Sequence, residues 1–295
     1  MPTSDIPDII HLNRLNDVFF KALLGSEERK TLTLNFINAI LNREGSNAFT
    51  SVTFSDKEIV PPRIDGKRSF LDVLVEMNDG TRVHVEVQVL LDEYMANRSL
   101  YYWGRIYSRE LEKGDVYANL RPVITINLLD FDQFPQYQTY INTYHITNDV
   151  TYDILTNHLE MHFIELKKIH ISDIKKLKRS ERWIAYFSPN FSDQERRAIA
   201  MSDTAIKEAM EYEKQFATNN KLKSAYWEHE RTMRDIASAL YSREKIGQER
   251  GDKTGRQALS TLLQKLLQEG RKEDVDRVLR DNEYQEKLLK EYHLK

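Results

Sequence analysis

The chain has 295 residues, of which 40% are hydrophobic and 30% charged, so it is long enough for one domain with a sizeable core and a further region. Its formal net charge of −3 argues against a protein that coats nucleic acid with its whole surface, and the lack of cysteine excludes disulfides, thiolate metal sites and cysteine nucleophiles. No apolar stretch is long enough to span a membrane and residues 1–15 lack the pattern of a secretory signal, so we expect a cytoplasmic protein.

The first part of the chain is predicted to be helical. Apolar residues with helical spacing run from Asn16 to Leu41. Gly25 and Ser26 interrupt this run, and Ser26 is a suitable N-cap for a helix whose first turn carries two glutamates. We therefore expect two helices in this range.

The segments that follow have the composition of strands. They are rich in Val, Leu and Phe and are bounded by Pro, Gly and Asn. One long helix is expected among them, with Asp92 as its cap and its end near Lys113. The predicted strands cover residues 52–60, 70–77, 82–90, 123–129, 143–148 and 161–166. This order of helices, strands, helix and strands predicts one mixed α/β domain that ends near residue 170.

Residues 171–295 are predicted to form a charged helical region. Glycines recur there at every fourth position, at Gly247, Gly251 and Gly255. Because each glycine costs a helix about 1 kcal/mol relative to alanine, we expect a frayed helix or a hinge at this place. Residues 256–295 predict two or three short amphipathic helices, and two of these have the spacing of a small helix-turn-helix.

A hairpin around Asn78-Asp79-Gly80 carries the most informative acids. A three-residue loop that ends in glycine pairs Met77 with Thr81. In that register Asp72 lies directly opposite Glu86, with about 5 Å between their Cβ atoms. A two-residue loop would instead send the two acids to opposite faces of the sheet.

These two acids are suited to holding a metal ion. A carboxylate among apolar neighbours is costly to bury unless it binds a metal or a partner, and Mg²⁺ accepts one or two carboxylates together with waters. Gln88 should point to the same face as Glu86 and orient a water or contact a phosphate. We expect His84 to face away from the acids. The alternative, that Asp72 and Glu86 are charges on half-exposed strands, stays open at this point.

The pattern of Asp72 followed by Glu86-Val87-Gln88 on the next strand resembles motifs of the PD-(D/E)XK nuclease superfamily. More closely, the chain is similar to a bacterial family of recombination-promoting nucleases and transposases. Several segments match that family in order and together cover about residues 13–130. They are Asn16–Lys21, Phe70–Val73, Val85–Gln88, Arg98–Trp103 and Leu111–Tyr117.

The resemblance implies an α/β fold with a PD-(D/E)XK restriction-endonuclease-like core, a mixed sheet flanked by helices, over residues 1–170. It implies an endonuclease that hydrolyses DNA phosphodiester bonds and is linked to recombination or mobile elements. The expected cofactor is Mg²⁺ or another divalent cation such as Mn²⁺ or Ca²⁺. Asp72 and Glu86 would be the metal ligands, and Asp17 and Lys21, one helical turn apart, would join Gln88 in the catalytic set.

One position departs from the superfamily pattern, which usually has lysine where this chain has Gln88. Glutamine cannot supply a positive charge, and Lys21 is our candidate for that role. On the next helix, Arg98 and Tyr102 lie four residues apart and are candidates for contact with a DNA phosphate. Their alternative interpretation is an exposed arginine and a core tyrosine.

Two further interpretations follow from the sequence. A DNA-binding or interaction protein that keeps the nuclease fold without cutting is the alternative function, and both Gln88 and the slightly acidic net charge favour it. The need for a divalent metal distinguishes the two functions. We expect the helical region, residues 171–295, to help bind DNA or to mediate self-association, for example as a homodimer.

Overall fold

The computed structural model forms two compact units, Met1–Glu230 and Arg231–Lys295. The residues that it describes are 12–55, 58–59, 69–70, 72–109, 111, 114–170 and 173–294.

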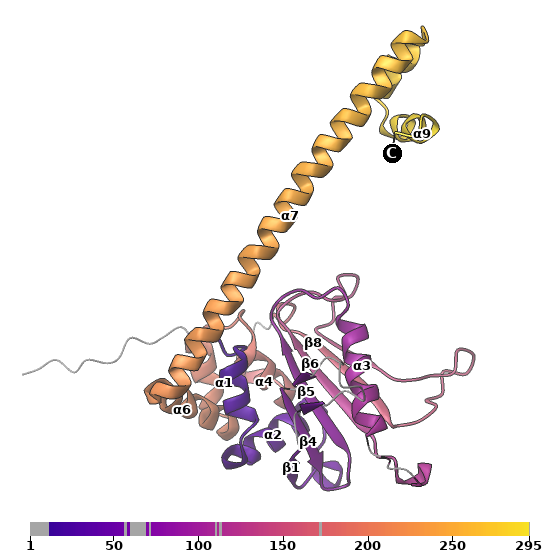
Figure 1. Cartoon of the computed structure of the whole chain (residues 1–295). Helices are drawn as coiled ribbons and strands as arrows, with labels where there is room; N and C mark the ends of the chain where they lie inside the picture. Colours follow the sequence, from indigo (N-terminus) through magenta and orange to yellow (C-terminus); the bar gives the residue numbers. More distant parts are fainter. Residues whose placement is uncertain are drawn as a thin grey trace, which may run out of the picture. The chain divides into compact units, whose positions relative to one another are not determined.

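A mixed sheet forms the centre of the first unit (Figure 1). Among the described residues it has six strands, in the order β1-β4-β5-β6-β8-β7. The neighbours β5, β6 and β8 are parallel, and the other neighbouring strands are antiparallel. The strands are β1 (Val52–Phe54), β4 (Val73–Met77), β5 (Arg82–Gln88), β6 (Val123–Leu129), β7 (Ile141–Tyr144) and β8 (Leu159–Glu165), while β2 (Glu58–Ile59) and β3 (Ser69–Phe70) pair separately.

Helices cover both faces of the sheet (Figure 1). The alternation of side chains along the strands explains this, since Val73 and Val85 belong to the larger core cluster while Leu74 packs with Ile106 on the opposite face. Ile106 belongs to α3 (Met95–Ser108), the helix on that opposite face. The other helices that flank the sheet contribute residues to the larger core cluster. These are α1 (Asp17–Leu24), α2 (Lys30–Ile40), α4 (Arg179–Phe187), α5 (Asp193–Ala200) and α6 (Thr204–Thr218). The mixed sheet flanked by helices confirms the predicted α/β fold class.

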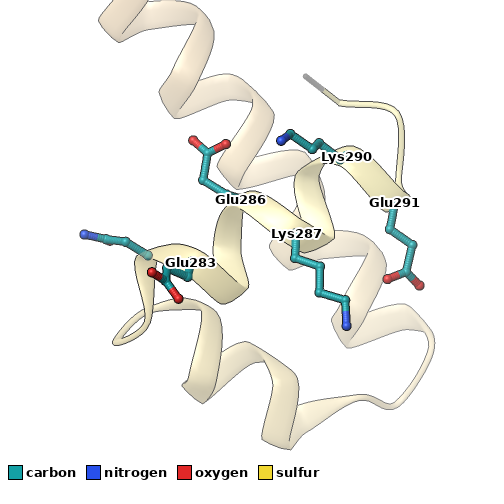
Figure 2. Close-up of a pocket in the computed structure, with 6 residues that line it drawn as sticks. Glu283, Glu286, Lys287, Lys290 and Glu291 are labelled. Carbon is teal, nitrogen blue, oxygen red and sulfur yellow. The ribbon is translucent and has the colours of Figure 1, made fainter.

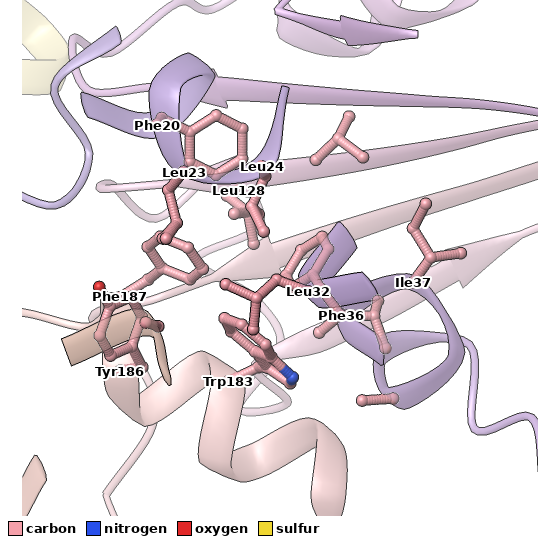
Figure 3. Packing of buried hydrophobic residues seen from close by; sticks show 14 of the residues in the cluster. Phe20, Leu23, Leu24, Leu32, Phe36, Ile37, Leu128, Trp183, Tyr186 and Phe187 are labelled. Carbon is pink, nitrogen blue, oxygen red and sulfur yellow. The ribbon is translucent and has the colours of Figure 1, made fainter. Parts of the chain in front are cut away.

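Aromatic side chains from distant segments hold the larger core cluster together (Figure 3). The ring centroids of Phe36 and Trp183 are 5.5 Å apart, and those of Phe20 and Phe187 are 5.4 Å apart. Phe20 and Phe36 come from α1 and α2, whereas Trp183 and Phe187 come from α4. The first unit therefore extends past the boundary expected near residue 170, because the helices beyond that point complete its core.

Several helix ends differ from the sequence expectations. The side chain of Ser26 makes no capping bond, and the residues after it form a short 3-10 helix, Glu27–Arg29, that leads into α2. The helix α1 is capped by Asn16, which accepts hydrogen bonds from the backbone N–H groups of Val18 and Phe19. The helix α3 begins after Asp92, whose side chain accepts from the N–H of Tyr94. It ends at Ser108, and the predicted end at Lys113 lies outside the described residues. The strands of the sheet are shorter than expected, except for β6, which has the predicted bounds, and β8, which begins two residues before and ends one residue before the predicted range.

The hairpin between β4 and β5 has the predicted register. Gly80 adopts a φ of 84°, a left-handed conformation that favours glycine. The N–H of Met77 donates to the carbonyl of Thr81 at 2.9 Å, and Val73 is paired with Val85. One step further along the same register, Asp72 comes opposite Glu86.

The helix α7 (Asn220–Gln268) includes Gly247, Gly251 and Gly255, the positions for which we expect a frayed helix or a hinge. Its C-terminal part packs with α8 (Lys272–Val278) and α9 (Asn282–Glu291) around a core of its own. The buried members of this core are Leu262, Leu266, Val278, Leu288 and Leu289. The short amphipathic helices expected in this part of the chain are thus confirmed.

A pocket on the second unit has charged walls of both signs (Figure 2). It is lined by Asn282, Glu283, Glu286, Lys287, Lys290 and Glu291. Every residue that the sequence predicts for the functional site belongs to the first unit, and every residue that lines this pocket belongs to the second. Across the described ranges, no helix combines the length and the apolar character needed to cross a bilayer.

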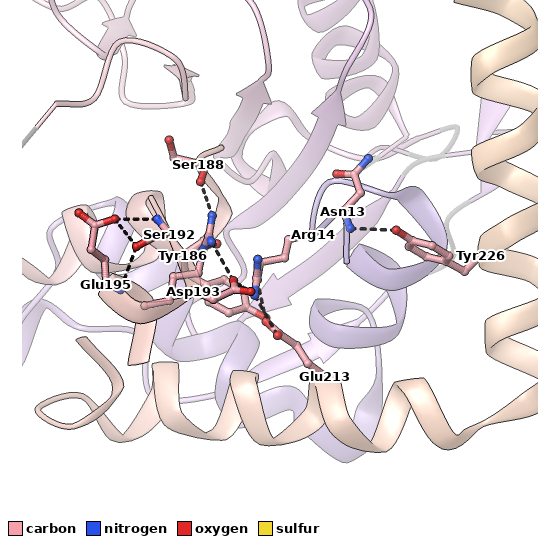
Figure 4. A network of polar contacts seen from close by, with 10 residues as sticks. Asn13, Arg14, Tyr186, Ser188, Ser192, Asp193, Glu195, Glu213 and Tyr226 are labelled. Atoms are coloured by element: carbon pink, nitrogen blue, oxygen red, sulfur yellow. Dashed lines mark hydrogen bonds and ion pairs between the residues drawn. The ribbon is translucent and has the colours of Figure 1, made fainter. Parts of the chain in front are cut away.

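A buried arginine ties the start of the described chain to α5 and α6 (Figure 4). Arg14 donates to Glu213 at 2.7 and 3.0 Å and to Asp193 at 3.1 Å. Its guanidinium also lies 5.4 Å from the ring centroid of Tyr186. The arginine is only 9% exposed, so its charge depends on these partners for compensation.

We predict that Arg14→Met lowers the free energy of unfolding by about 3–5 kcal/mol, because it leaves Glu213 as a largely buried charge without its arginine. The matched control is Arg179→Met, which removes an exposed ion pair with Glu44 at 3.6 Å and should cost less than about 1 kcal/mol. Urea unfolding followed by tryptophan fluorescence measures both. Equal losses for the two variants would contradict a structural role for the Arg14 network.

Candidate functional site

The two acids of the hairpin, Asp72 and Glu86, are buried at its open end, far from the turn. Asp72 forms a bend just before β4 and is 8% exposed, and Glu86 lies in β5 and is 3% exposed. The N–H of Val87 donates to Oδ2 of Asp72 at 2.8 Å. The carboxylate of Asp72 is therefore fixed against the strand that carries Glu86.

A lysine from α1 reaches the first of these acids. Lys21 Nζ lies 3.1 Å from Oδ1 of Asp72 and 2.7 Å from Oδ1 of Asp17, one turn earlier on the same helix. Asn16 caps α1 and also donates to Glu230 at 2.8 Å, so the N-terminus of this helix is held by the first turns of α7. The structure thus brings Asp17, Lys21 and Asp72 together.

The second acid is held by two nitrogen donors. Arg98 Nη2, from α3, lies 2.6 Å from Oε1 of Glu86, and His84 Nε2 lies 3.2 Å from Oε2. The expectation that His84 faces away from the acids is wrong. Residues 84 and 86 are two apart on one strand, and the period-two alternation places them on the same face.

Burial and charge act in opposite directions on the two carboxyls. Burial raises the pKa of Asp72 well above its usual range, and the nearby carboxylates of Glu86 and Asp17 raise it further, against a lowering effect of Lys21. Burial alone would also raise the pKa of Glu86, but the hydrogen bonds and positive charge from His84 and Arg98 lower it overall. Glu86 is therefore the acid that keeps its charge most readily.

The same carboxylates hold Lys21 in its charged form. Burial by itself would lower the pKa of Lys21, but the negative charges of Asp72 and Asp17 raise it overall. Lys21, the residue that we expect from the sequence to supply a positive charge, therefore lies beside the acids and holds its proton more strongly than an ordinary lysine.

The other predicted residues lie close by but make different contacts. The side-chain amide of Gln88 donates to the backbone carbonyl of Leu90 at 3.1 Å. The ring of Tyr102 packs edge-on to that of His84, with 6.0 Å between centroids, and lies 5.5 Å from the guanidinium of Arg98. Tyr102 thus supports the two residues that hold Glu86.

The acids of this site match the kind of oxygen ligands that Mg²⁺ takes, but they do not form a preassembled cage. Among the residues that the structure describes, no group of three or more histidine, aspartate or glutamate side chains is placed to hold a metal ion. Mg²⁺ commonly uses one or two carboxylates and keeps several waters, so a pair such as Asp72 and Glu86 is sufficient in donor chemistry.

We predict that Asp72→Asn stabilises the protein in EDTA. A carboxyl whose pKa is raised by folding binds more protons in the folded than in the unfolded chain, so its contribution to stability falls as the pH rises above about 3.9. Asparagine does not titrate, and the variant should exceed wild type by about 1–2 kcal/mol at neutral pH.

Urea unfolding between pH 4.5 and 8 tests this prediction, and the advantage of Asp72→Asn should grow with pH. Asp149→Asn, at an exposed position, serves as the matched control and should leave the stability unchanged within about 0.5 kcal/mol. A variant at Asp72 that is less stable than wild type throughout this range would refute the charge crowding inferred for the site.

The family comparison covers this whole site. A family model described as "PD-(D/E)XK nuclease family transposase" matches residues 14–243 of the chain. The matched range includes every predicted site residue from Asp17 to Tyr102. No curated protein and no solved structure matches the chain.

Proposed function

The chain belongs to the PD-(D/E)XK nuclease family transposases, and we propose that it is a divalent-metal-dependent endonuclease that hydrolyses phosphodiester bonds in DNA. Membership of this family points to a nuclease with a role in mobile elements. The observation that carries the finer proposal is the cross-strand pair of buried carboxylates, Asp72 and Glu86, with Lys21 beside it. Buried acids in such a pair are costly for stability and are retained where they hold a cation or a substrate.

The charge of the site supports a divalent cation as cofactor. The raised pKa of Asp72 reflects burial and the crowding of its carboxyl by those of Glu86 and Asp17, which a cation would relieve. Asp72 and Glu86 would hold Mg²⁺, or Mn²⁺ or Ca²⁺ in its place. When bound, such an ion would make a water more acidic and offset negative charge on the phosphate.

Other side chains of the chain would act on the substrate or on the acids. Lys21 would stabilise the negative charge that develops on the phosphate, the role that Gln88 cannot fill. His84 would orient Glu86 through its Nε2, and Tyr102 would fix the ring of His84. Gln88 stays our candidate for a contact with the reacting water or the phosphate, for which its amide would have to leave the carbonyl of Leu90.

The alternative function is a DNA-binding or interaction protein that keeps this fold without cutting. The bond between Gln88 and Leu90 favours it, because the amide is engaged with the backbone. Both oxygens of Glu86 are likewise held by protein donors. A cutting enzyme requires Asp72 and Glu86 to bind a divalent ion, whereas a pure binder does not.

We also propose a supporting role for the helical C-terminal region. The helices α8 and α9 are joined by a short turn and pack on the end of α7 in a core of their own, as in small helical DNA-binding modules. Binding of DNA, or self-association into a homodimer, is the contribution that we propose for it.

The central prediction is that the purified chain nicks or linearises supercoiled plasmid in Mg²⁺ and not in EDTA. Asp72→Ala should abolish cleavage, because it removes a ligand of the ion, and Asp149→Ala should leave it intact. Gel electrophoresis of the plasmid measures the products. If protein that binds DNA cuts with none of Mg²⁺, Mn²⁺ and Ca²⁺, the non-cutting alternative replaces the nuclease.

A second prediction concerns the positive charge that the motif lacks. Lys21→Met should lower the cleavage rate by about 10²–10³-fold, the usual cost of losing a group that stabilises transition-state charge. Lys30→Met is the matched control, since Lys30 lies on α2 with its side chain 59% exposed. Single-turnover cleavage rates compare the two variants, and melting temperatures check that both are folded. Equal losses at the two positions would rule out Lys21 as the source of the charge.

A further inference from the structure

All four carboxylate oxygens of Asp72 and Glu86 have a nitrogen partner from the protein. Asp72 is bound by Lys21 and by the N–H of Val87, and Glu86 by Arg98 and His84. The site therefore supplies its own counter-charges, one from α1 and one from α3. A carboxylate oxygen can bind an ion and still accept a hydrogen bond, but a divalent ion on Glu86 Oε1 or on Asp72 Oδ1 would share that oxygen with a cation, Arg98 or Lys21.

Arg98 is the partner that can leave at the lowest cost. Its guanidinium holds Glu86 through a single nitrogen, although an arginine can make two parallel bonds to a carboxylate. Within the described ranges its Nε is buried and has no hydrogen-bond partner. The side chain of Arg98 is 36% exposed, so water can reach it.

The other three partners are held more firmly. His84 is 1% exposed and packs against Tyr102, and the N–H of Val87 is part of the backbone of β5. Lys21 is shared by two aspartates, at 2.7 and 3.1 Å, so its departure would leave both without their cation. The loss of Arg98 leaves each acid with a hydrogen bond and leaves Asp72 with its lysine.

We propose that Arg98 occupies the place of the divalent ion at Glu86, that the ion displaces its guanidinium from Oε1, and that the released guanidinium binds a phosphate of the DNA. This inference rests on the proposed metal-dependent nuclease. A guanidinium and a divalent ion repel each other strongly within hydrogen-bond distance of the same oxygen, so the two bind Glu86 in turn. Released from Glu86, the guanidinium is free to bind another anion, and a phosphate accepts two of its N–H groups.

This exchange couples metal binding to DNA binding. The ion frees Arg98 for the phosphate, and the phosphate keeps Arg98 away from Glu86, so each ligand should raise the affinity for the other by the same factor. A neutral residue at position 98 removes this coupling. It also removes the competition for Glu86, so the ion should bind the DNA-free protein more tightly.

The test is calorimetric titration of Mn²⁺ into the full chain without DNA. Arg98→Met and Arg98→Gln should lower the Kd for Mn²⁺ about tenfold relative to wild type, since neither variant competes for Glu86. Arg98→Lys keeps a positive charge and should stay near wild type. Arg105→Met, two turns further along α3, is the matched control for the loss of one positive charge from that helix and should change the Kd less than twofold.

A second measurement uses a short DNA duplex and Ca²⁺, with binding followed by fluorescence anisotropy. Ca²⁺ should raise the affinity of wild type for the duplex at least about tenfold, and that of Arg98→Met clearly less. Melting temperatures in EDTA establish that each variant is folded. Because both Arg98→Met and Arg98→Gln are tested, the inference can still be judged from one of them if the other does not fold.

The outcomes separate this inference from the proposed function. If wild type cuts plasmid but Mn²⁺ binds Arg98→Met and Arg98→Gln no more tightly than wild type, the exchange is refuted and the nuclease stands. If Lys21→Met rather than the Arg98 variants tightens Mn²⁺ binding, the displaced cation is Lys21 and the assignment to Arg98 fails. If Mn²⁺ binds none of the proteins, the exchange and the metal centre are refuted together.

Discussion

The first unit is arranged around the need to compensate two carboxylates that are buried on one hairpin. In an apolar environment a lone carboxylate is so unfavourable that it must be neutralised or paired. Lys21 comes to Asp72 from α1, which packs in the larger core cluster, and Arg98 comes to Glu86 from α3 on the opposite face of the sheet. The compensation therefore requires both helical layers in place. A protein that lost either layer would retain the acids without their counter-charges.

This constraint explains why the helices after residue 170 belong to the same compact unit. Lys21 can reach Asp72 only if α1 is held in position. The aromatic contact between Phe19 and Phe216, with centroids 5.1 Å apart, fixes the middle of α1 against α6. The hydrogen bond from Asn16 to Glu230 fixes its N-terminus. The late helices thus contribute to the site although none of their residues is among those predicted for it.

The parts of the site that sequence could predict are those set by local rules. Turn geometry at Gly80 predicted the register of the hairpin, and the register predicted that Asp72 meets Glu86. The placement of His84 was also within reach, because residues 84 and 86 share a face in any strand. The ion pair between Arg98 and Glu86, and the core contacts of α4 to α6, depend on how distant segments pack. Local spacing carries no information about such packing, so the extent of the first unit and the partner of Arg98 required the structure.

The turn at Gly80 makes the chemistry vulnerable at a distance. The acids lie five residue pairs from the tip of the hairpin, about 17 Å along the strands. A Cβ at Gly80 would approach Arg121 to 3.2 Å and would strain a backbone with positive φ. A different turn would slip the strands by one residue and separate Asp72 from Glu86 to opposite faces. A change at this glycine would therefore reach the acids, although the glycine touches neither of them.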